Sequence, residues 1–290
     1  MEITLNIRTI RSKVALLDSH VGEELWDAAK IFAAHLCKTS DVYTIAENNN
    51  GTIHLETSER AKGVCCGKLL RGKRVLELGA GVAALGMCAA ALGAKEVLCT
   101  DYDKDVLHNL EFNLKHNLEV INHNSISDAS KEERNCVNTA KLSFAKLDWR
   151  SFASDDVKSA GWIFNDEEVE LNDHEIRVQD KVQELNADIV IGSALVYSAQ
   201  GALYCADTIK HFLIDRDTEE CWILQMPSRP GFDRFLLRLE YWGLDVQSFD
   251  ISELVFEAAT KHMGNVHSTI EDFKLYVITS TVNNDPIQGG

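Results

Sequence analysis

From Lys73 onward the chain alternates short apolar runs with amphipathic stretches, and this alternation limits the folds open to it. Apolar runs of strand length separated by segments of helix length predict a parallel sheet with helices on both faces. Seven strands are expected, at residues 74–80, 96–102, 141–149, 187–197, 221–228, 244–250 and 274–280. The sequence therefore predicts an α/β fold with a seven-stranded, mostly parallel sheet.

The segment before this alternation has a different character. Residues 22–37 carry apolar side chains at helical spacing, namely Leu25, Ala29, Phe32 and Leu36. The next stretch, residues 38–68, is polar and contains a turn signal of three asparagines and a glycine, so it is interpreted as an irregular linker or insertion. We expect an N-terminal helical arm and linker over residues 1–66 and one α/β domain over residues 67–290.

Charge restricts the partners that the chain can take. The formal net charge is −16, and nucleic-acid backbones are bound by Lys and Arg, so nucleic-acid binding is not expected. A basic partner is easier to accommodate. Residues 153–186 hold ten Asp or Glu against three Lys or Arg, which indicates a solvated acidic loop or, alternatively, a docking surface for a basic substrate.

The apolar segments and the cysteines indicate in which cellular compartment the chain is expected. No run of about 18 apolar residues occurs, and the N-terminus lacks an apolar stretch of signal-peptide length. We therefore expect no membrane association and a cytoplasmic location, with the nucleus as a second compartment. The eight cysteines are scattered without C-x-x-C spacing, so no metal site is expected.

The segment from Val75 to Gly86, VLELGAGVAALG, predicts a strand, a glycine turn and a helix. Gly79 and Gly81 let the backbone bend sharply and approach a ligand, and the helix N-terminus offers free N–H groups. Asp101 ends the next strand, 22 residues after Gly79, where a carboxylate can accept hydrogen bonds from both ribose hydroxyls. Together these residues predict an adenosine site on a Rossmann-like sheet.

The glycine spacing does not by itself identify the cofactor. Gly79, Gly81 and Ala84 also satisfy the pattern of NAD-binding proteins. Glu77, two residues before the first glycine, and the Leu-Asp-Trp element that ends the third strand favour S-adenosylmethionine. NAD stays as the alternative, although no catalytic Ser, Tyr and Lys arrangement supports an oxidoreductase.

Five segments, ELWDAA, VLELGAG, the acid of CTDYD, KLDW and DIVIGSALVYS, occur in this order over residues 20–280. The ordered set resembles family 16 of the seven-β-strand, class I methyltransferases, which includes protein lysine methyltransferases. The resemblance implies an S-adenosylmethionine-dependent enzyme that methylates lysine on a protein substrate. The negative net charge of the chain favours a basic protein as that substrate. It leaves the oligomeric state open.

The resemblance also implies roles for individual residues. Glu77, Gly79 and Gly81 would line the methionine and ribose end of the cofactor, and Asp101 would hold the ribose. Asp148 would contact the adenine amino group, with Trp149 beside it, and Trp26 would lie over the cofactor. Core packing is the alternative for both tryptophans.

Two departures from the family pattern bear on activity. Ala83 stands where a third glycine is common, a change expected only to tighten the start of the helix. Ala194 stands where the family commonly has an acid three residues before Tyr197, and such an acid would orient the substrate amine. Tyr197 is expected to shape the substrate channel. Two other hypotheses therefore stay open, a small-molecule N-methyltransferase and an interaction module that binds the cofactor without catalysis.

Overall fold

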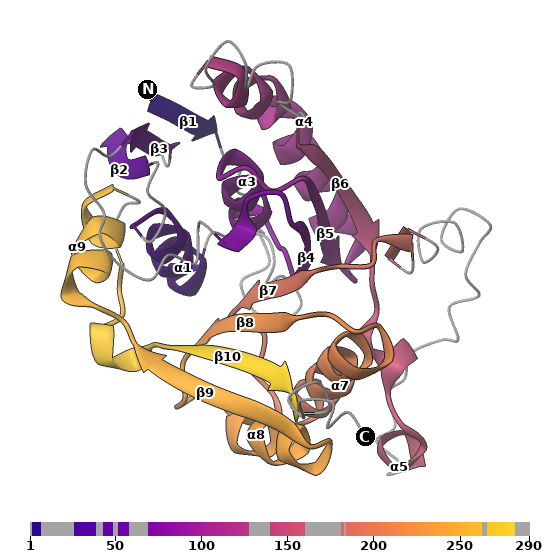
Figure 1. The fold of residues 1–290 in the computed structure, drawn as a ribbon. Coiled ribbons are helices and arrows are strands. Elements are labelled where there is room, and N and C mark those ends of the chain that lie inside the picture. The colour runs from indigo at the N-terminus through magenta and orange to yellow at the C-terminus, as the bar shows by residue number, and fades with distance from the viewer. Residues whose placement is uncertain are drawn as a thin grey trace, which may run out of the picture.

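A seven-stranded sheet forms the centre of the structure (Figure 1). The computed structural model describes residues 2–6, 26–38, 43–48, 52–57, 69–127, 140–159, 181–182, 184–262 and 266–281. The sheet consists of β4 (Arg74–Leu78), β5 (Glu96–Asp101), β6 (Lys141–Lys146), β7 (Ile189–Ser193), β8 (Glu220–Gln225), β9 (Leu244–Asp250) and β10 (Lys274–Ser280).

The strand order is β6-β5-β4-β7-β8-β10-β9, and the first five strands are parallel. Strand β10 runs antiparallel to both of its neighbours, β8 and β9. Chain order reverses at β4, so β5 and β7 lie on opposite sides of it. In open α/β sheets such a reversal places a crevice outside the carboxyl ends of the strands. The predicted fold class is confirmed.

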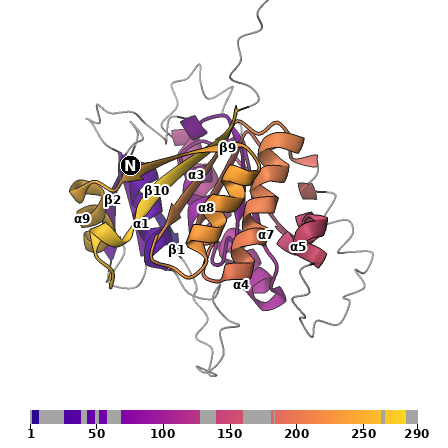
Figure 2. The ribbon, with the colours of Figure 1, turned by 90° about the horizontal axis from the view of Figure 1, so that it is seen from below.

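Side-chain alternation along the strands explains why helices cover both faces. In β4, Val75 belongs to one apolar cluster, whereas Leu76 and Leu78 belong to the other, because successive side chains point to opposite faces. The first cluster is completed by α1 (Asp27–Lys38), α3 (Ala84–Ala91), α4 (Lys104–Ser127) and α9 (Glu253–His262). The second cluster is completed by α7 (Ala199–Lys210) and α8 (Phe232–Tyr241), which cover the other face of the sheet (Figure 2).

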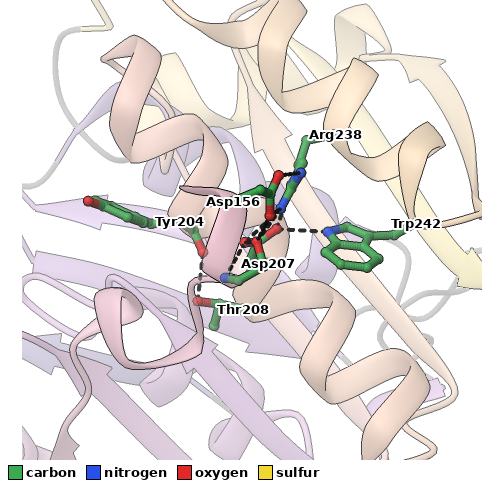
Figure 3. A network of polar contacts seen from close by, with 7 residues as sticks. Asp156, Tyr204, Asp207, Thr208, Arg238 and Trp242 are labelled. Carbon is green, nitrogen blue, oxygen red and sulfur yellow. Dashed lines mark hydrogen bonds and ion pairs between the residues drawn. The ribbon is translucent and has the colours of Figure 1, made fainter. Parts of the chain in front are cut away.

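A partly buried ion-pair network joins α7, α8 and the start of α5 (Asp155–Ser159) (Figure 3). Arg238 Nε donates to Asp207 Oδ1 at 2.7 Å, and Arg238 Nη1 donates to Asp156 Oδ2 at 2.8 Å. Trp242 Nε1 and Ser154 Oγ also donate to Asp207, at 2.7 and 2.8 Å. Because Asp207 is 1% exposed and Arg238 8%, these contacts compensate two charges that have lost most of their water.

The region interpreted as an irregular linker contains strands, so that interpretation was wrong. Strand β2 (Tyr43–Asn48) pairs antiparallel with β3 (Thr52–Thr57), and β1 (Glu2–Asn6) pairs with the other edge of β3. Ile53 and Leu55 alternate with polar residues, and an Asn-Gly pair precedes Thr52. Both features are typical of a hairpin, although the high polarity of the segment obscured them. The boundary between residues 66 and 67 stays a prediction.

Several predicted elements begin or end at other residues in the structure. The predicted helix over residues 22–37 corresponds to α1, which begins at Asp27; residues 22–25 lie outside the described part of the chain. The strands predicted over 141–149 and 187–197 end early, at Lys146 and Ser193. Ala194 has φ +52°, a left-handed conformation that a strand cannot continue through. Beyond Lys146 the chain enters a 3₁₀ helix at Trp149–Phe152, and beyond Ser193 it forms a loop.

The structure tests the expectations on charge and membranes only for the described residues. Most of the acidic stretch 153–186 lies outside them, between residues 160 and 180. Within the residues that the structure describes, none of the helices has the length and apolar character needed to cross a bilayer. The same residues hold no cluster of His, Cys, Asp or Glu side chains suited to a metal ion.

Candidate functional site

A cavity of about 480 Å³ lies at the carboxyl ends of the parallel strands. It is lined by every residue that the sequence predicts for the site: Trp26, Glu77, Gly79, Gly81, Asp101, Asp148, Trp149, Ala194 and Tyr197. These residues come from five separate parts of the chain, which the sheet brings to one edge. The structure therefore places them together, whereas their individual roles stay predictions.

The glycine turn between β4 and α3 needs its glycines for two reasons. Gly79 and Gly81 have φ values of +56° and +52°, in the left-handed region that side chains with a Cβ rarely adopt. A Cβ on Gly79 would lie 3.0 Å from Leu195 Cδ2 and 3.5 Å from Trp149 Cζ2. Gly79 therefore lets the loops after β6 and β7 close over the turn.

Glu77 is buried in the centre of the sheet and binds the start of α3. Its Oε2 accepts a hydrogen bond of 2.9 Å from the backbone N–H of Gly86. A Cβ on Gly86 would lie 2.6 Å from that oxygen and 2.3 Å from Cys99 Sγ, so the position has room only for glycine. Burial raises the pKa of Glu77 to about 8. Glu77 is not exposed at a sheet edge, and it caps a helix whose N-cap residue, Ala83, has no side-chain donor or acceptor.

Asp101 holds the glycine turn to the end of β5. Its Oδ2 accepts from the backbone N–H of Gly81 at 3.0 Å, and its Oδ1 accepts from those of Tyr102 and Asp103 at 2.8 and 3.3 Å. Burial raises the pKa of this carboxyl group, and the three N–H donors oppose the rise. The helix cap considered for Asp101 belongs to Asp103, whose Oδ1 accepts from the backbone N–H of Asp105 at 2.8 Å.

The loop after β6 supplies Asp148 and Trp149. Asp148 accepts hydrogen bonds from the backbone N–H and the Nε of Arg150, at 2.9 and 3.0 Å from Oδ1, and a further one from its Nη2. The indole of Trp149 packs against the second apolar cluster and also lines the cavity, so core packing and site lining both apply to it. Trp26 directly precedes α1, lines the cavity and is 39% exposed, which is too open for a core position.

The loop after β7 forms the wall opposite Asp101. Tyr197 is 43% exposed there, and burial of its hydroxyl group raises its pKa to about 12. The phenol therefore stays neutral, as expected for a residue that shapes a channel and does not act as a base. Asp188 lies at the other end of the strand, where its Oδ1 accepts from Arg74 Nη2 at 2.6 Å, so it cannot substitute for an acid at Ala194.

Sequence reasoning missed Gln225, Tyr102 and Arg229. Gln225, which ends β8, accepts from the backbone N–H of Val196 at 3.1 Å and donates to its carbonyl oxygen at 2.9 Å. This two-way clamp fixes the loop that carries Tyr197. Tyr102 and Arg229 line the cavity. Tyr102 is the last residue of the strand predicted over residues 96–102, and Arg229 directly follows the strand predicted over residues 221–228. Polar residues at the carboxyl ends of strands were the signal that could have identified all three.

Comparison with known proteins identifies the family. A family model described as lysine methyltransferase matches residues 9–161, a little more than half of the chain. The protein N-terminal and lysine N-methyltransferase EFM7 of Yarrowia lipolytica is 46% identical over 48 residues. This match covers 16% of the chain and spans 18% of that relative's length.

Two solved structures resemble the chain more distantly. A TehB-like SAM-dependent methyltransferase from Corynebacterium glutamicum has a TM-score of 0.39 at 15% identity, over 89% of this chain and 90% of that one. A ribosomal protein L11 methylase from Lactobacillus delbrueckii subsp. bulgaricus has a TM-score of 0.36 at 11% identity, over 73% and 72%. The strand order and the family match carry the assignment, and the chain belongs to the lysine methyltransferase family.

Proposed function

We propose that this chain transfers a methyl group from S-adenosylmethionine to a lysine side chain of a protein substrate. One observation carries the proposal. A single cavity is lined on one side by the glycine turn and Asp101, and on the other by Tyr197. An adenosine-binding half and an open, partly aromatic half therefore share one space, and membership of the lysine methyltransferase family supports this division of the cavity.

The residues on the cavity side that holds the glycine turn and Asp101 fit S-adenosylmethionine. An ionised carboxylate has about four acceptor positions, and three backbone N–H groups occupy Asp101, so one remains for a ribose hydroxyl. The positive φ values of Gly79 and Gly81 bring bare backbone to the cavity wall. Trp26 and Trp149 add aromatic surface against which an adenine or a sulfonium can pack.

The cofactor supplies an electrophilic methyl group whose transfer is an in-line displacement, so the protein's main task is alignment. A lysine nucleophile, with a reference pKa of about 10.4, must first lose its proton. An apolar channel favours this loss because it desolvates the ammonium. Tyr197 and Leu195 line such a channel, and the neutral phenol of Tyr197 adds no charge to it.

The substrate proposed is a basic protein segment. A net charge of −16 raises the local concentration of cationic partners and disfavours polyanions. The exclusion of nucleic acid and of membranes, and the cytoplasmic or nuclear location, stay predictions from composition. Methylation of intact proteins compared with small amines would distinguish this substrate class from the small-molecule alternative.

Calorimetric titration with S-adenosylhomocysteine is the first test, with NAD as a parallel ligand. We expect a micromolar dissociation constant, about −8 kcal/mol, for S-adenosylhomocysteine and no binding of NAD. Asp101→Asn should weaken the affinity about tenfold, because it replaces a charged acceptor with a neutral one. Asp105→Asn, on the exposed first turn of α4, is the matched control and should bind as the unmodified protein does. Binding of NAD alone would refute the proposal.

A second candidate function is favoured by Ala194, which leaves the acceptor wall without the family's acid. In this reading the chain binds the cofactor and acts as an interaction module without catalysis. Ala194→Asp is a mild structural change, since Asp tolerates the left-handed φ of +52° better than Ala does. Transfer of labelled methyl groups to lysate proteins by the variant, and not by the unmodified chain, would establish the second candidate. Transfer by the unmodified chain would exclude it.

A further inference from the structure

The charged groups around the cavity are compensated, with one exception. Asp101 and Asp103 accept hydrogen bonds from backbone N–H groups, and Asp148 is paired with Arg150. Arg229 also lines the cavity and is partly buried. Among the residues that the structure describes, its side chain has no hydrogen-bond or ion-pair partner. An uncompensated cation inside a cavity favours an anionic ligand group.

Arg229 is held on the acceptor wall by its backbone. Its N–H donates to the carbonyl oxygen of Met226 at 3.2 Å, and its own carbonyl accepts from Phe232 at 3.2 Å. A Cβ on Gly231 would lie 2.4 Å from the carbonyl oxygen of Ser198, so this turn packs directly against the residue after Tyr197. Arg229 therefore sits beside the channel loop.

The position of Arg229 separates it from the acids of the cofactor half. Asp101 ends β5 and Asp148 follows β6, on one side of β4, whereas Arg229 follows β8 on the other side. The loop after β7 contributes uncharged residues to the cavity, with Ala194 at its start. The acceptor half consequently carries a positive charge and lacks a carboxylate among its described lining residues.

We propose that Arg229 binds a carboxylate carried by the methyl acceptor, so that the enzyme selects an amine accompanied by an acidic group. The proposal rests on the methyltransferase function above and narrows its substrate class. A planar guanidinium matches a carboxylate with two parallel hydrogen bonds. The acceptor's own carboxylate thereby supplies the anchor that an acid at Ala194 would otherwise provide. The net charge acts at longer range, so a basic protein with one acidic residue beside its target lysine satisfies both requirements.

A binding experiment tests the contact without requiring turnover. The protein, saturated with S-adenosylhomocysteine, is titrated with N-acetylglutamate and with its neutral isostere N-acetylglutamine while arginine Nε–Hε signals are followed by NMR. The Arg229 signal is identified by its loss in Arg229→Gln. We expect N-acetylglutamate to shift this signal with about tenfold higher affinity than N-acetylglutamine. Equal shifts, or none, would overturn the proposal.

A transfer experiment tests selection. A set of peptides has a central lysine, and Glu, Gln or Lys is placed at each flanking position in turn. The transfer of labelled methyl groups to each peptide is measured. The unmodified chain should favour Glu over Gln about tenfold at one or more positions, Arg229→Gln should remove that preference, and Arg229→Glu should favour Lys. Arg234→Gln, on the exposed face of α8, is the matched control. Equal methylation of Glu and Gln peptides by the unmodified chain would count against Arg229.

The two proposals fail in different ways. If S-adenosylhomocysteine does not bind, the methyltransferase function fails before any acceptor probe is added. If it binds and no peptide is methylated, the peptide substrate class fails, and the NMR titration still decides whether Arg229 holds a carboxylate.

Discussion

Ala83 shows how one side chain can store strain in the glycine turn. The sequence predicts that this residue only tightens the start of α3, but its φ of +64° is left-handed. That conformation costs an L-residue about 1–2 kcal/mol, whereas glycine adopts it freely. Ala83 therefore marks a place where the chain departs from the family's glycine at a cost in stability.

We predict that Ala83→Gly raises the free energy of unfolding by about 0.5–1 kcal/mol, after allowing for glycine's greater freedom in the unfolded chain. Urea denaturation followed by circular dichroism measures the change. Ala84→Gly, at the first position of α3, is the control and should lower the free energy of unfolding by about 1 kcal/mol. Destabilisation by both substitutions would mean that Ala83 is not strained.

The second residue-scale prediction concerns Glu77. Its pKa in the folded protein is about 8 because of burial, above its ordinary value of 4.5. Between these pH values the folded state holds a proton that the unfolded state has released, so Glu77 makes stability fall as pH rises through this window. The slope from one such group is at most about 1.4 kcal/mol per pH unit.

Replacing Glu77 with Gln isolates this contribution. We expect the free energy of unfolding of Glu77→Gln to fall less steeply than that of the unmodified chain between pH 5 and about 8. Urea denaturation at a series of pH values measures both slopes. Parallel curves would show that Glu77 is ionised in the folded protein across this range.

At the scale of elements, the Arg238 network links α7 to α8 (Figure 3). Removing one partner of a buried ion pair costs about 3–5 kcal/mol because the remaining charge stays without compensation. Arg238→Leu should reach the lower end of this range, since Asp207 keeps its donors from Trp242 and Ser154. Urea denaturation again provides the measurement.

Two further variants make the test specific. Arg234→Leu on the same helix is exposed and should change stability by less than about 0.5 kcal/mol. Replacing both Arg238 and Asp207 with Leu should recover part of the loss, because no unpaired buried charge remains; Asp156, the other partner of Arg238, is exposed to water. If the double variant is as unstable as the sum of the two single ones, the pair is not energetically coupled.

At the scale of the whole molecule, α1 belongs to the core shared with the sheet. Ile31, Phe32 and Leu36 are each 0% exposed and lie in the same apolar cluster as α3 and α9. Burying three such side chains contributes about 5–9 kcal/mol, which is comparable to the total stability of a typical domain. A domain boundary at residue 66 would divide this core.

We predict that a variant lacking residues 1–66 loses cooperative thermal unfolding and binds a hydrophobic dye, because the faces of α3 and α9 that α1 covers become exposed. Differential scanning calorimetry and dye fluorescence measure the two effects. A truncated variant that unfolds cooperatively at the unmodified chain's midpoint would support an independent domain over residues 67–290.

Much of this fold could be predicted from the sequence because its signals are local. The alternation of Val75 with Leu76 and Leu78 follows from strand geometry, and the glycine turn lies within a dozen residues. The carboxyl ends of parallel strands share one edge, and the predicted site residues from different strands line one cavity there. The hairpin of β2 and β3 was missed because its alternation is weak in a polar segment.

The sequence by itself determined the central strands and their order along the chain, the position of the glycine turn and the acid at the end of β5, because periodicity and glycine spacing are local signals. The tertiary structure decided what each polar group contacts. Glu77 caps α3, Gln225 clamps Val196, and Arg238 pairs with Asp207 across 31 residues. Such contacts depend on the packing of helices and loops far apart in the chain, and the same packing leaves Arg229 uncompensated in the acceptor half of the cavity.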